Sequence, residues 1–243
     1  MDGVFPATAR PRPQRGARPR RRPSRVERFY RDHLRKLLAA RRRRRYVAKG
    51  NYNLTRLGYL HELFPDARFL IPVRDPVWHI ASLMKQHRLF LEGQRDNPRA
   101  VRHLKRIGHF EFGVDRRPIN PGAPQAVAEV QALWAAGDEV AGWAAYWALL
   151  HGYVADLLAS DPALAAATRV VRYEALCDAP VATLTDVFEF CGLPAEPAWV
   201  ESIAADLKAP DYYQPQFSAA ERAQIAARTG AVARRFGYDV ALN

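Results

Sequence analysis

The 243-residue sequence predicts an α/β protein in which a parallel sheet is flanked by helices. Three short apolar runs have the composition of buried parallel strands: residues 46–49, 68–73 and 168–172. Helical patterns separate these runs, and strands that alternate with helices are typical of βαβ units. Ligands of such sheets bind beyond the C-terminal ends of the strands, so the residues that follow each run are the first candidates for a site.

The net charge of +12 is concentrated at the N-terminus. Residues 1–45 carry +14, and the rest of the chain carries −2. Residues 6–23 are rich in proline and arginine and have little to bury, so residues 1–23 are predicted to form a disordered leader before a single domain at 24–243. The leader has two interpretations: it binds nucleic acid or another anionic surface, or its arginines have no selected function.

The first helix is predicted to begin at Ser24. The run from Ser24 to Glu27 has the pattern of a capping box, in which a hydroxyl and a carboxylate satisfy backbone amides reciprocally. Apolar residues recur behind it at helical spacing and are predicted to face a core. Five arginines at 41–45 follow where the helix ends, and cations there complement the negative end of the helix dipole.

Four further helices are predicted, at residues 54–64, 76–90, 139–160 and 218–235. The segment from 140 to 155 is uncharged, but it is shorter than the roughly 20 residues that span a bilayer. Its aromatic and leucine residues form a stripe, which indicates a packed helix of a domain without a transmembrane segment.

The cysteines and the N-terminal residues indicate in which cellular compartment the protein is expected. Cys177 and Cys191 cannot build a disulfide framework, and no Cys/His cluster indicates zinc, so no metal is expected. The N-terminus has no apolar region typical of a secretory signal. A cytoplasmic location is therefore expected.

A candidate anion site follows the strand at 68–73. Asp75 suits the N-cap of the next helix and Pro76 suits its first turn, which places Arg74 at the strand tip beside a helix N-terminus. Ser82 lies eight residues after Arg74. A guanidinium and a hydroxyl in this arrangement could hold a phosphate. A capped helix whose arginine pairs with a carboxylate is the alternative.

The run HELFPDARFLIPVRDP at residues 61–76, with Ser82 beyond it, resembles the 3′-phosphate-binding motif of sulfotransferases that use 3′-phosphoadenosine 5′-phosphosulfate (PAPS). VRYEAL at 171–176 and FCGLP at 190–194 are similar to a later block of that family, and FGYD at 236–239 is similar to its end. The resemblance implies a sheet of the P-loop-NTPase-like, sulfotransferase type.

The resemblance also implies roles for four residues. Arg74 and Ser82 would hold the 3′-phosphate of PAPS, and Tyr173 would lie near its adenine. Lys49 would be the catalytic residue that stabilises charge on the transferred sulfuryl group. A core tyrosine and a solvated lysine at the end of a strand are the alternatives for Tyr173 and Lys49.

The sequence departs from the family pattern at the residue expected to remove a proton. In the cytosolic branch a catalytic histidine lies two residues after the lysine, where this chain has Asn51, and an amide is not a general base. Five other residues remain candidates for that role: His61, His79, His87, His109 and Glu111.

The Gly-rich loop that binds the 5′-phosphosulfate in the family is not found in the sequence, since Gly3 and Gly16 are isolated. We therefore expect a sheet that lacks its first strand, as a late start codon or a truncated gene would produce, and poor sulfuryl transfer by this chain. Unpaired strand edges would make the chain marginally stable or prone to self-association.

The predicted function is transfer of a sulfuryl group from PAPS to a hydroxyl or amine of a small-molecule or carbohydrate acceptor, with residues 86–136 lining the acceptor pocket. A non-catalytic nucleotide-binding module of the same fold is the main alternative. Nucleic-acid binding by the leader would instead predict a steep salt dependence that is lost with residues 1–23. A kinase of similar architecture is poorly supported, because the Walker lysine and magnesium-binding carboxylates are missing from the sequence.

Overall fold

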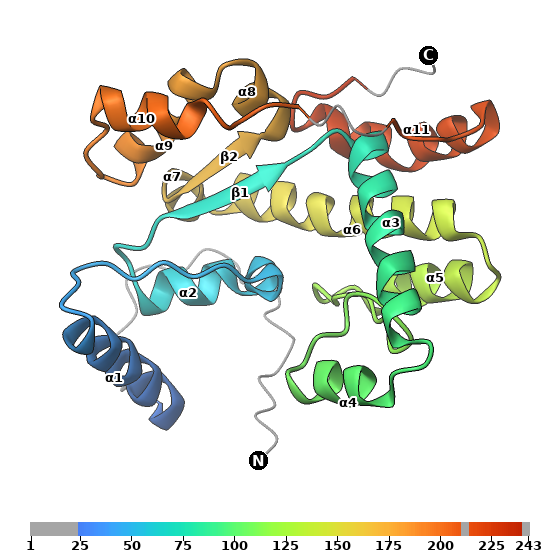
Figure 1. Cartoon of the computed structure of the whole chain (residues 1–243), viewed down its shortest axis with the longest axis horizontal. Helices are drawn as coiled ribbons and strands as arrows, with labels where there is room; N and C mark the ends of the chain where they lie inside the picture. Colours follow the sequence, from blue (N-terminus) through green and yellow to red (C-terminus); the bar gives the residue numbers. More distant parts are fainter. Residues whose placement is uncertain (1–23, 210–213, 240–243) are drawn as a thin grey trace.

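The computed structural model describes residues 24–209 and 214–239, so the predicted leader at 1–23 lies outside the described residues. The elements follow one another from the N-terminal α1 to the C-terminal α11 (Figure 1). In chain order they are α1 (Arg25–Ala40), the 3₁₀ helix η1 (Asn51–Arg56), α2 (Leu57–Leu63), β1 (Phe69–Val73), α3 (Pro76–Gln94), α4 (Pro98–Arg106), α5 (Pro124–Ala135), α6 (Glu139–Ser160), α7 (Pro162–Ala166), β2 (Thr168–Arg172), α8 (Tyr173–Asp178), α9 (Pro180–Phe190), α10 (Pro197–Ala204) and α11 (Ala219–Arg234).

The sheet of the described residues has two parallel strands, β1 and β2. Their register runs from Phe69 opposite Thr168 to Val73 opposite Arg172. Both strands lie where the sequence predicts them, and Figure 1 shows them side by side with helices around them. The α/β class and the parallel pairing are therefore confirmed.

The predicted strand at 46–49 is wrong. The segment is irregular and exposed, and the side chain of Val47 is 89% exposed. Its anchor is polar: the Arg45 guanidinium donates to the carbonyl oxygens of Cys191 at 2.5 Å and Gly192 at 2.7 Å. These acceptors lie just beyond the end of α9, where helix carbonyls lack partners in the helix. The segment thus runs past the end of α9 and pairs with neither of the two strands that the structure describes.

Helix α1 confirms the predicted cap but not the predicted core face. The Ser24 hydroxyl accepts from the Glu27 amide, and the Glu27 carboxylate accepts from the Ser24 amide. Phe29, however, is 70% exposed and Val26 is 50% exposed. The helix meets α2 through few contacts, among them a bond from Arg31 to the Leu63 carbonyl at 2.8 Å. Helical periodicity identifies an apolar face, but it does not show that another element covers it.

The core is built around α6. Trp143 and Trp147 are each 1% exposed, and the inward side chains of β1, Ile71 and Val73, belong to the same cluster. Helices α3, α5 and α11 pack against α6, which confirms the predicted packed helix. Within the described part of the chain, no helix is long and apolar enough to cross a membrane.

Pro72 lies on the edge of β1 that faces away from β2. The Phe69 amide donates to the Ala167 carbonyl, on the β2 side. Backbone amides alternate sides along a strand, so Leu70 and Pro72 belong to the other edge. Proline has no amide hydrogen to offer there and is confined to such edges in natural sheets. Pro72 therefore removes one hydrogen-bond donor from the strand edge that we expected to be unprotected.

Pro72→Val is expected to increase self-association of the chain, because valine restores a donor at the unpaired edge of β1. Size-exclusion chromatography with light scattering should show a larger fraction of dimers or higher species than the wild type at equal concentration. Pro197→Val, at the start of α10, controls for the loss of a proline. An unchanged mass distribution for Pro72→Val would contradict the role of this edge.

Candidate functional site

Arg74 and Tyr173 lie together at the C-terminal ends of the two strands. Arg74 follows the last residue of β1, and Tyr173 follows the last residue of β2. Because the strands are parallel and in register, both residues reach the same end of the sheet. The Arg74 guanidinium carbon lies 4.6 Å from the centre of the Tyr173 ring. Two of the predicted nucleotide-binding residues are thus brought into contact.

The Arg74 guanidinium also lies over an aromatic ring of α3. Its carbon atom is 5.3 Å from the centre of the Trp78 ring, so the cation contacts two π-faces. The Nε atom of Arg74 is buried and has no hydrogen-bond partner in the described structure. A buried donor without a partner is costly, and an anionic ligand would satisfy it.

Helix α3 begins beside Arg74 as the sequence predicts. The Asp75 carboxylate accepts from the Trp78 amide at 3.1 Å, and Pro76 is the first helical residue. Burial raises the pKa of Asp75, and the nearby Glu174 carboxylate raises it further. Ser82 lies one helical turn beyond Trp78 and is half-buried. The two side chains therefore share a face of α3 that starts at Arg74.

A second set of contacts fixes the strand ends. Glu174 Oε1 accepts from the Asp75 amide at 3.0 Å. The Tyr238 hydroxyl lies 2.9 Å from the Val73 carbonyl oxygen and 2.5 Å from Glu174 Oε2. Burial and the Glu174 carboxylate raise the pKa of Tyr238, so the phenol stays protonated as a donor. These bonds tie β1, α8 and the C-terminal segment together around Arg74.

Lys49 lies elsewhere, on the exposed segment before η1. The Asn51 amide donates to Glu111 Oε2 at 2.6 Å, which connects this segment to the loop between α4 and α5. Gly50 between them is extended, with φ −165° and ψ 120°. Lys49 thus lies two residues before the Asn51–Glu111 contact in the sequence.

The structure separates the five candidates for proton removal. His79 Nδ1 accepts from the Trp147 indole at 3.1 Å, and burial lowers the pKa of His79 to about 3. Burial also lowers the pKa of His87, whose Nδ1 accepts from the Gly113 amide. His61 packs edge-on against Phe69, and His109 stacks on Phe90. Among the five, Glu111 contacts the segment that carries Lys49.

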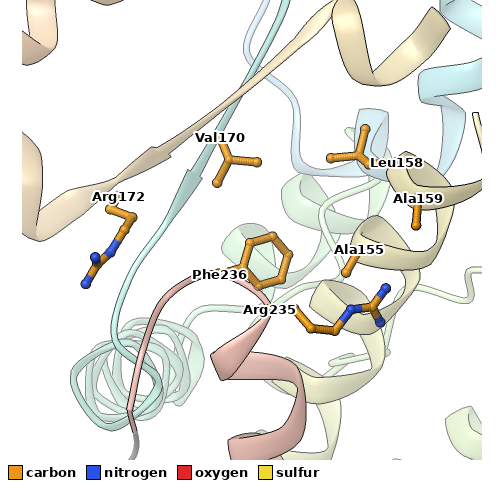
Figure 2. A pocket seen from close by; sticks show the side chains of 7 residues that line it. All are labelled: Ala155, Leu158, Ala159, Val170, Arg172, Arg235 and Phe236. Carbon is orange, nitrogen blue, oxygen red and sulfur yellow. The ribbon is translucent and has the colours of Figure 1, made fainter. Parts of the chain in front are cut away.

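A hollow of about 510 Å³ lies between α6, β2 and the end of α11. Figure 2 shows Val170 and Phe236 among its apolar lining, with Arg172 and Arg235 on different sides. Neither arginine is free, since Arg235 pairs with Asp156 at 2.7 Å and Arg172 stacks on the Tyr238 ring at 4.4 Å. The residues that line this hollow do not include any of the predicted site.

Trp78, Glu174 and Tyr238 join the candidate site although no role was predicted for them from the sequence. Their positions carried a signal, because Trp78 lies one turn before Ser82 and Glu174 follows Tyr173. Tyr238 belongs to the FGYD block at the end of the chain. Among the described residues, no group of three or more His, Cys, Asp or Glu is arranged to hold a metal ion.

Residues 17–116 match the model of the sulfotransferase family. The match includes α1, which lies before the region where the motifs resemble that family, and it also includes Lys49, Arg74 and Ser82. Tyr173 and the two later blocks lie beyond it. No curated protein and no solved structure matches the chain significantly. The family match covers 100 of the 243 residues and, together with the α/β fold, supports a sulfotransferase-like domain in this chain.

Proposed function

We propose that this protein binds PAPS and belongs to the enzymes that transfer its sulfuryl group to a hydroxyl or amine of a small-molecule or carbohydrate acceptor. The observation that carries the proposal is Arg74, which contacts the rings of Trp78 and Tyr173 at the strand ends and whose buried Nε has no hydrogen-bond partner among the described residues. The match to the sulfotransferase family over residues 17–116 supports the same proposal.

The side chains around Arg74 fit the 3′-phosphate end of this nucleotide. Arg74 would pair with the phosphate, and Ser82 on the same face of α3 would donate its hydroxyl. Tyr173, which contacts Arg74, would lie near the adenine, as the family resemblance implies. The Asp75 carboxylate accepts a hydrogen bond from the Trp78 amide. The Glu174 carboxylate accepts from the Asp75 amide and from the Tyr238 hydroxyl. Both carboxylates near the proposed anion are therefore held by hydrogen bonds.

Lys49 and Glu111 would serve the acceptor side. Bound PAPS supplies a sulfuryl group whose bond to the 5′-phosphate oxygen breaks as a bond to the acceptor oxygen or nitrogen forms. Lys49 would stabilise negative charge that develops during this step. Glu111, oriented by the Asn51 amide, would accept the proton that the acceptor loses.

A non-catalytic nucleotide-binding module is the second candidate. The observation in its favour is the sequence itself, which has no Gly-rich loop to hold the 5′-phosphosulfate. Removing a single preorganised donor commonly costs 10²–10³-fold in rate, so transfer without such a loop is expected to be slow. Nucleotide binding without turnover of PAPS would favour the non-catalytic module. Both candidates predict that Arg74 and Ser82 bind the 3′-phosphate.

Arg74→Ala is expected to weaken binding of 3′,5′-ADP by roughly 1.5–3 kcal/mol, the usual worth of a hydrogen bond to a charged group. Isothermal titration calorimetry measures it, and the wild type should prefer 3′,5′-ADP to 5′-AMP. Arg68→Ala is the matched control, because Arg68 lies at the opposite end of β1 and stacks on Phe190. Equal affinities of Arg74→Ala and wild type would remove Arg74 from the site.

A further inference from the structure

The two peptide groups on either side of Arg74 are both held by side chains from distant parts of the chain. Before Arg74, the Val73 carbonyl oxygen lies 2.9 Å from the Tyr238 hydroxyl. After Arg74, the Asp75 amide donates to Glu174 Oε1 at 3.0 Å. The Tyr238 hydroxyl also lies 2.5 Å from Glu174 Oε2, which joins the two side chains. We call these three contacts the Tyr238–Glu174 clamp, because they begin and end on the backbone next to Arg74.

Tyr238 reaches the clamp from the C-terminal end of α11. Gly237 has a φ of 76°, a left-handed conformation that favours glycine, and the Tyr238 amide donates to the Ala233 carbonyl oxygen at 3.1 Å. The chain therefore turns sharply after the helix. The Tyr238 side chain is 5% exposed, and the Arg172 guanidinium carbon lies 4.4 Å from the centre of its ring. A buried ring held in this way keeps its hydroxyl close to the end of β1.

The fixed backbone determines where the Arg74 guanidinium lies. Its carbon atom is 4.6 Å from the centre of the Tyr173 ring and 5.3 Å from the centre of the Trp78 ring. Its buried Nε has no hydrogen-bond partner among the described residues. A backbone shift at Val73 or Asp75 would move the guanidinium relative to both rings. Binding groups need to be held within roughly 0.5 Å of their working position, so contacts behind a binding side chain contribute to its affinity.

A purely structural role is the alternative for the clamp. A buried tyrosine with a bonded hydroxyl also occurs elsewhere in the core: Tyr146 is 7% exposed, and its oxygen accepts from the Ile119 amide at 3.0 Å. The clamp differs from this contact in its targets, because both of its backbone partners are the residues next to Arg74. The Tyr146 contact therefore provides a control with similar burial and a different backbone target.

We propose that Tyr238 and Glu174 are positioning residues that hold Arg74 for recognition of a 3′-phosphate. The inference deepens the proposed function and rests on it, because it takes Arg74 as the residue that binds this phosphate. Both side chains act through the backbone on either side of Arg74, so their loss should lower the affinity for ligands that carry a 3′-phosphate. The segment after α11 thereby supports a site that lies 165 residues away in the sequence, at the end of β1.

The main test is Tyr238→Phe in the full chain, with binding of 3′,5′-ADP and 5′-AMP measured by isothermal titration calorimetry. The variant removes only the hydroxyl, so affinity for 3′,5′-ADP should fall roughly 5- to 20-fold while affinity for 5′-AMP stays within about 2-fold. Tyr146→Phe is the matched control and should leave both affinities unchanged. In an Arg74→Ala background, Tyr238→Phe should have at most about a 2-fold further effect, because the residue that it positions is gone.

Two variants of Glu174 separate position from charge, since Glu174→Gln and Glu174→Ala both remove the carboxylate. Glutamine can still accept from the Asp75 amide and can donate to the Tyr238 oxygen, whereas alanine keeps neither contact. Glu174→Ala is therefore expected to bind 3′,5′-ADP roughly 5- to 20-fold more weakly than Glu174→Gln. Circular dichroism checks the fold of each variant, and this pair decides the matter if Tyr238→Phe does not fold.

Four results would overturn the inference. They are an unchanged affinity of Tyr238→Phe for 3′,5′-ADP, an equal loss of affinity for 5′-AMP, a full further loss in the Arg74→Ala background, and equal affinities of the two Glu174 variants. If the wild type does not bind 3′,5′-ADP, the proposed function fails and the inference fails with it. If the wild type and Tyr238→Phe bind 3′,5′-ADP equally well, the inference alone fails and the proposed function stands.

Discussion

Trp147→Ala is expected to lower the free energy of unfolding by about 3–5 kcal/mol, as is typical when a large buried side chain is truncated. The Trp147 side chain is 1% exposed at the centre of α6. Its ring stacks on His151 with centres 4.0 Å apart, and its indole donates to His79 of α3. Truncation would leave a cavity and an unpartnered acceptor between the helices, which is a large loss against the usual stability of about 5–15 kcal/mol.

Urea denaturation measures this loss, and Trp199→Ala is the matched control. Trp199 lies on α10, is 51% exposed and stacks on Phe188, so its truncation should cost much less. Trp147→Phe separates the two contributions, because it keeps an aromatic ring and removes the donor to His79. Similar losses for Trp147→Ala and Trp199→Ala would mean that α6 is not the centre of the core.

Elements with strong local signals were predictable from the sequence. Ser24 and Ser218 both form capping boxes, and Asp75 with Pro76 starts α3 as expected. The strand prediction at 46–49 failed because a short apolar run does not specify a partner strand. The carbonyls of Cys191 and Gly192 that anchor Arg45 come from almost 150 residues away, and no local pattern encodes such a contact.

In the candidate site, too, local features were predictable from the sequence and some long-range contacts were not. The position of Arg74 followed from local rules, because a strand end and a capped helix meet there. Its contact with Tyr173 depends on the parallel pairing of two strands about 100 residues apart, which the alternation of elements made predictable. The contact between Asn51 and Glu111 was not predictable, since it depends on how the loop after α4 packs on η1. The proposed roles of Lys49, Arg74, Ser82 and Tyr173 remain predictions.

Two histidines that contact Trp147 are held in the neutral form. His79 and His151 have ring centres 5.8 Å apart, and both contact Trp147, since His151 Nδ1 donates to its carbonyl oxygen at 2.8 Å. Burial lowers the pKa of His79 to about 3, with further lowering by His151 and Arg74, and burial lowers the pKa of His151 to about 4. Protonation of His79 would place a hydrogen on the atom that accepts the indole N–H of Trp147.

The free energy of unfolding is therefore expected to fall as the pH is lowered from about 6.5 toward 4. Both native pKa values lie below that of an unfolded histidine, so the unfolded chain takes up protons that the native protein excludes, and stability is full only above pH 6.5. The loss between pH 7 and pH 5 should be roughly 2–4 kcal/mol, measured by urea denaturation at each pH. In the double variant His79→Asn, His151→Asn this slope should become clearly shallower, because asparagine can form similar hydrogen bonds without titrating, while the lowered pKa values of His87 and Glu139 leave part of the slope in place. His103→Asn, on the exposed face of α4, should keep the slope. Burial raises the pKa of Asp75, which opposes the trend in every variant alike, so the comparison isolates the two histidines. An equal slope in the wild type and the double variant would show that other groups cause the acid sensitivity.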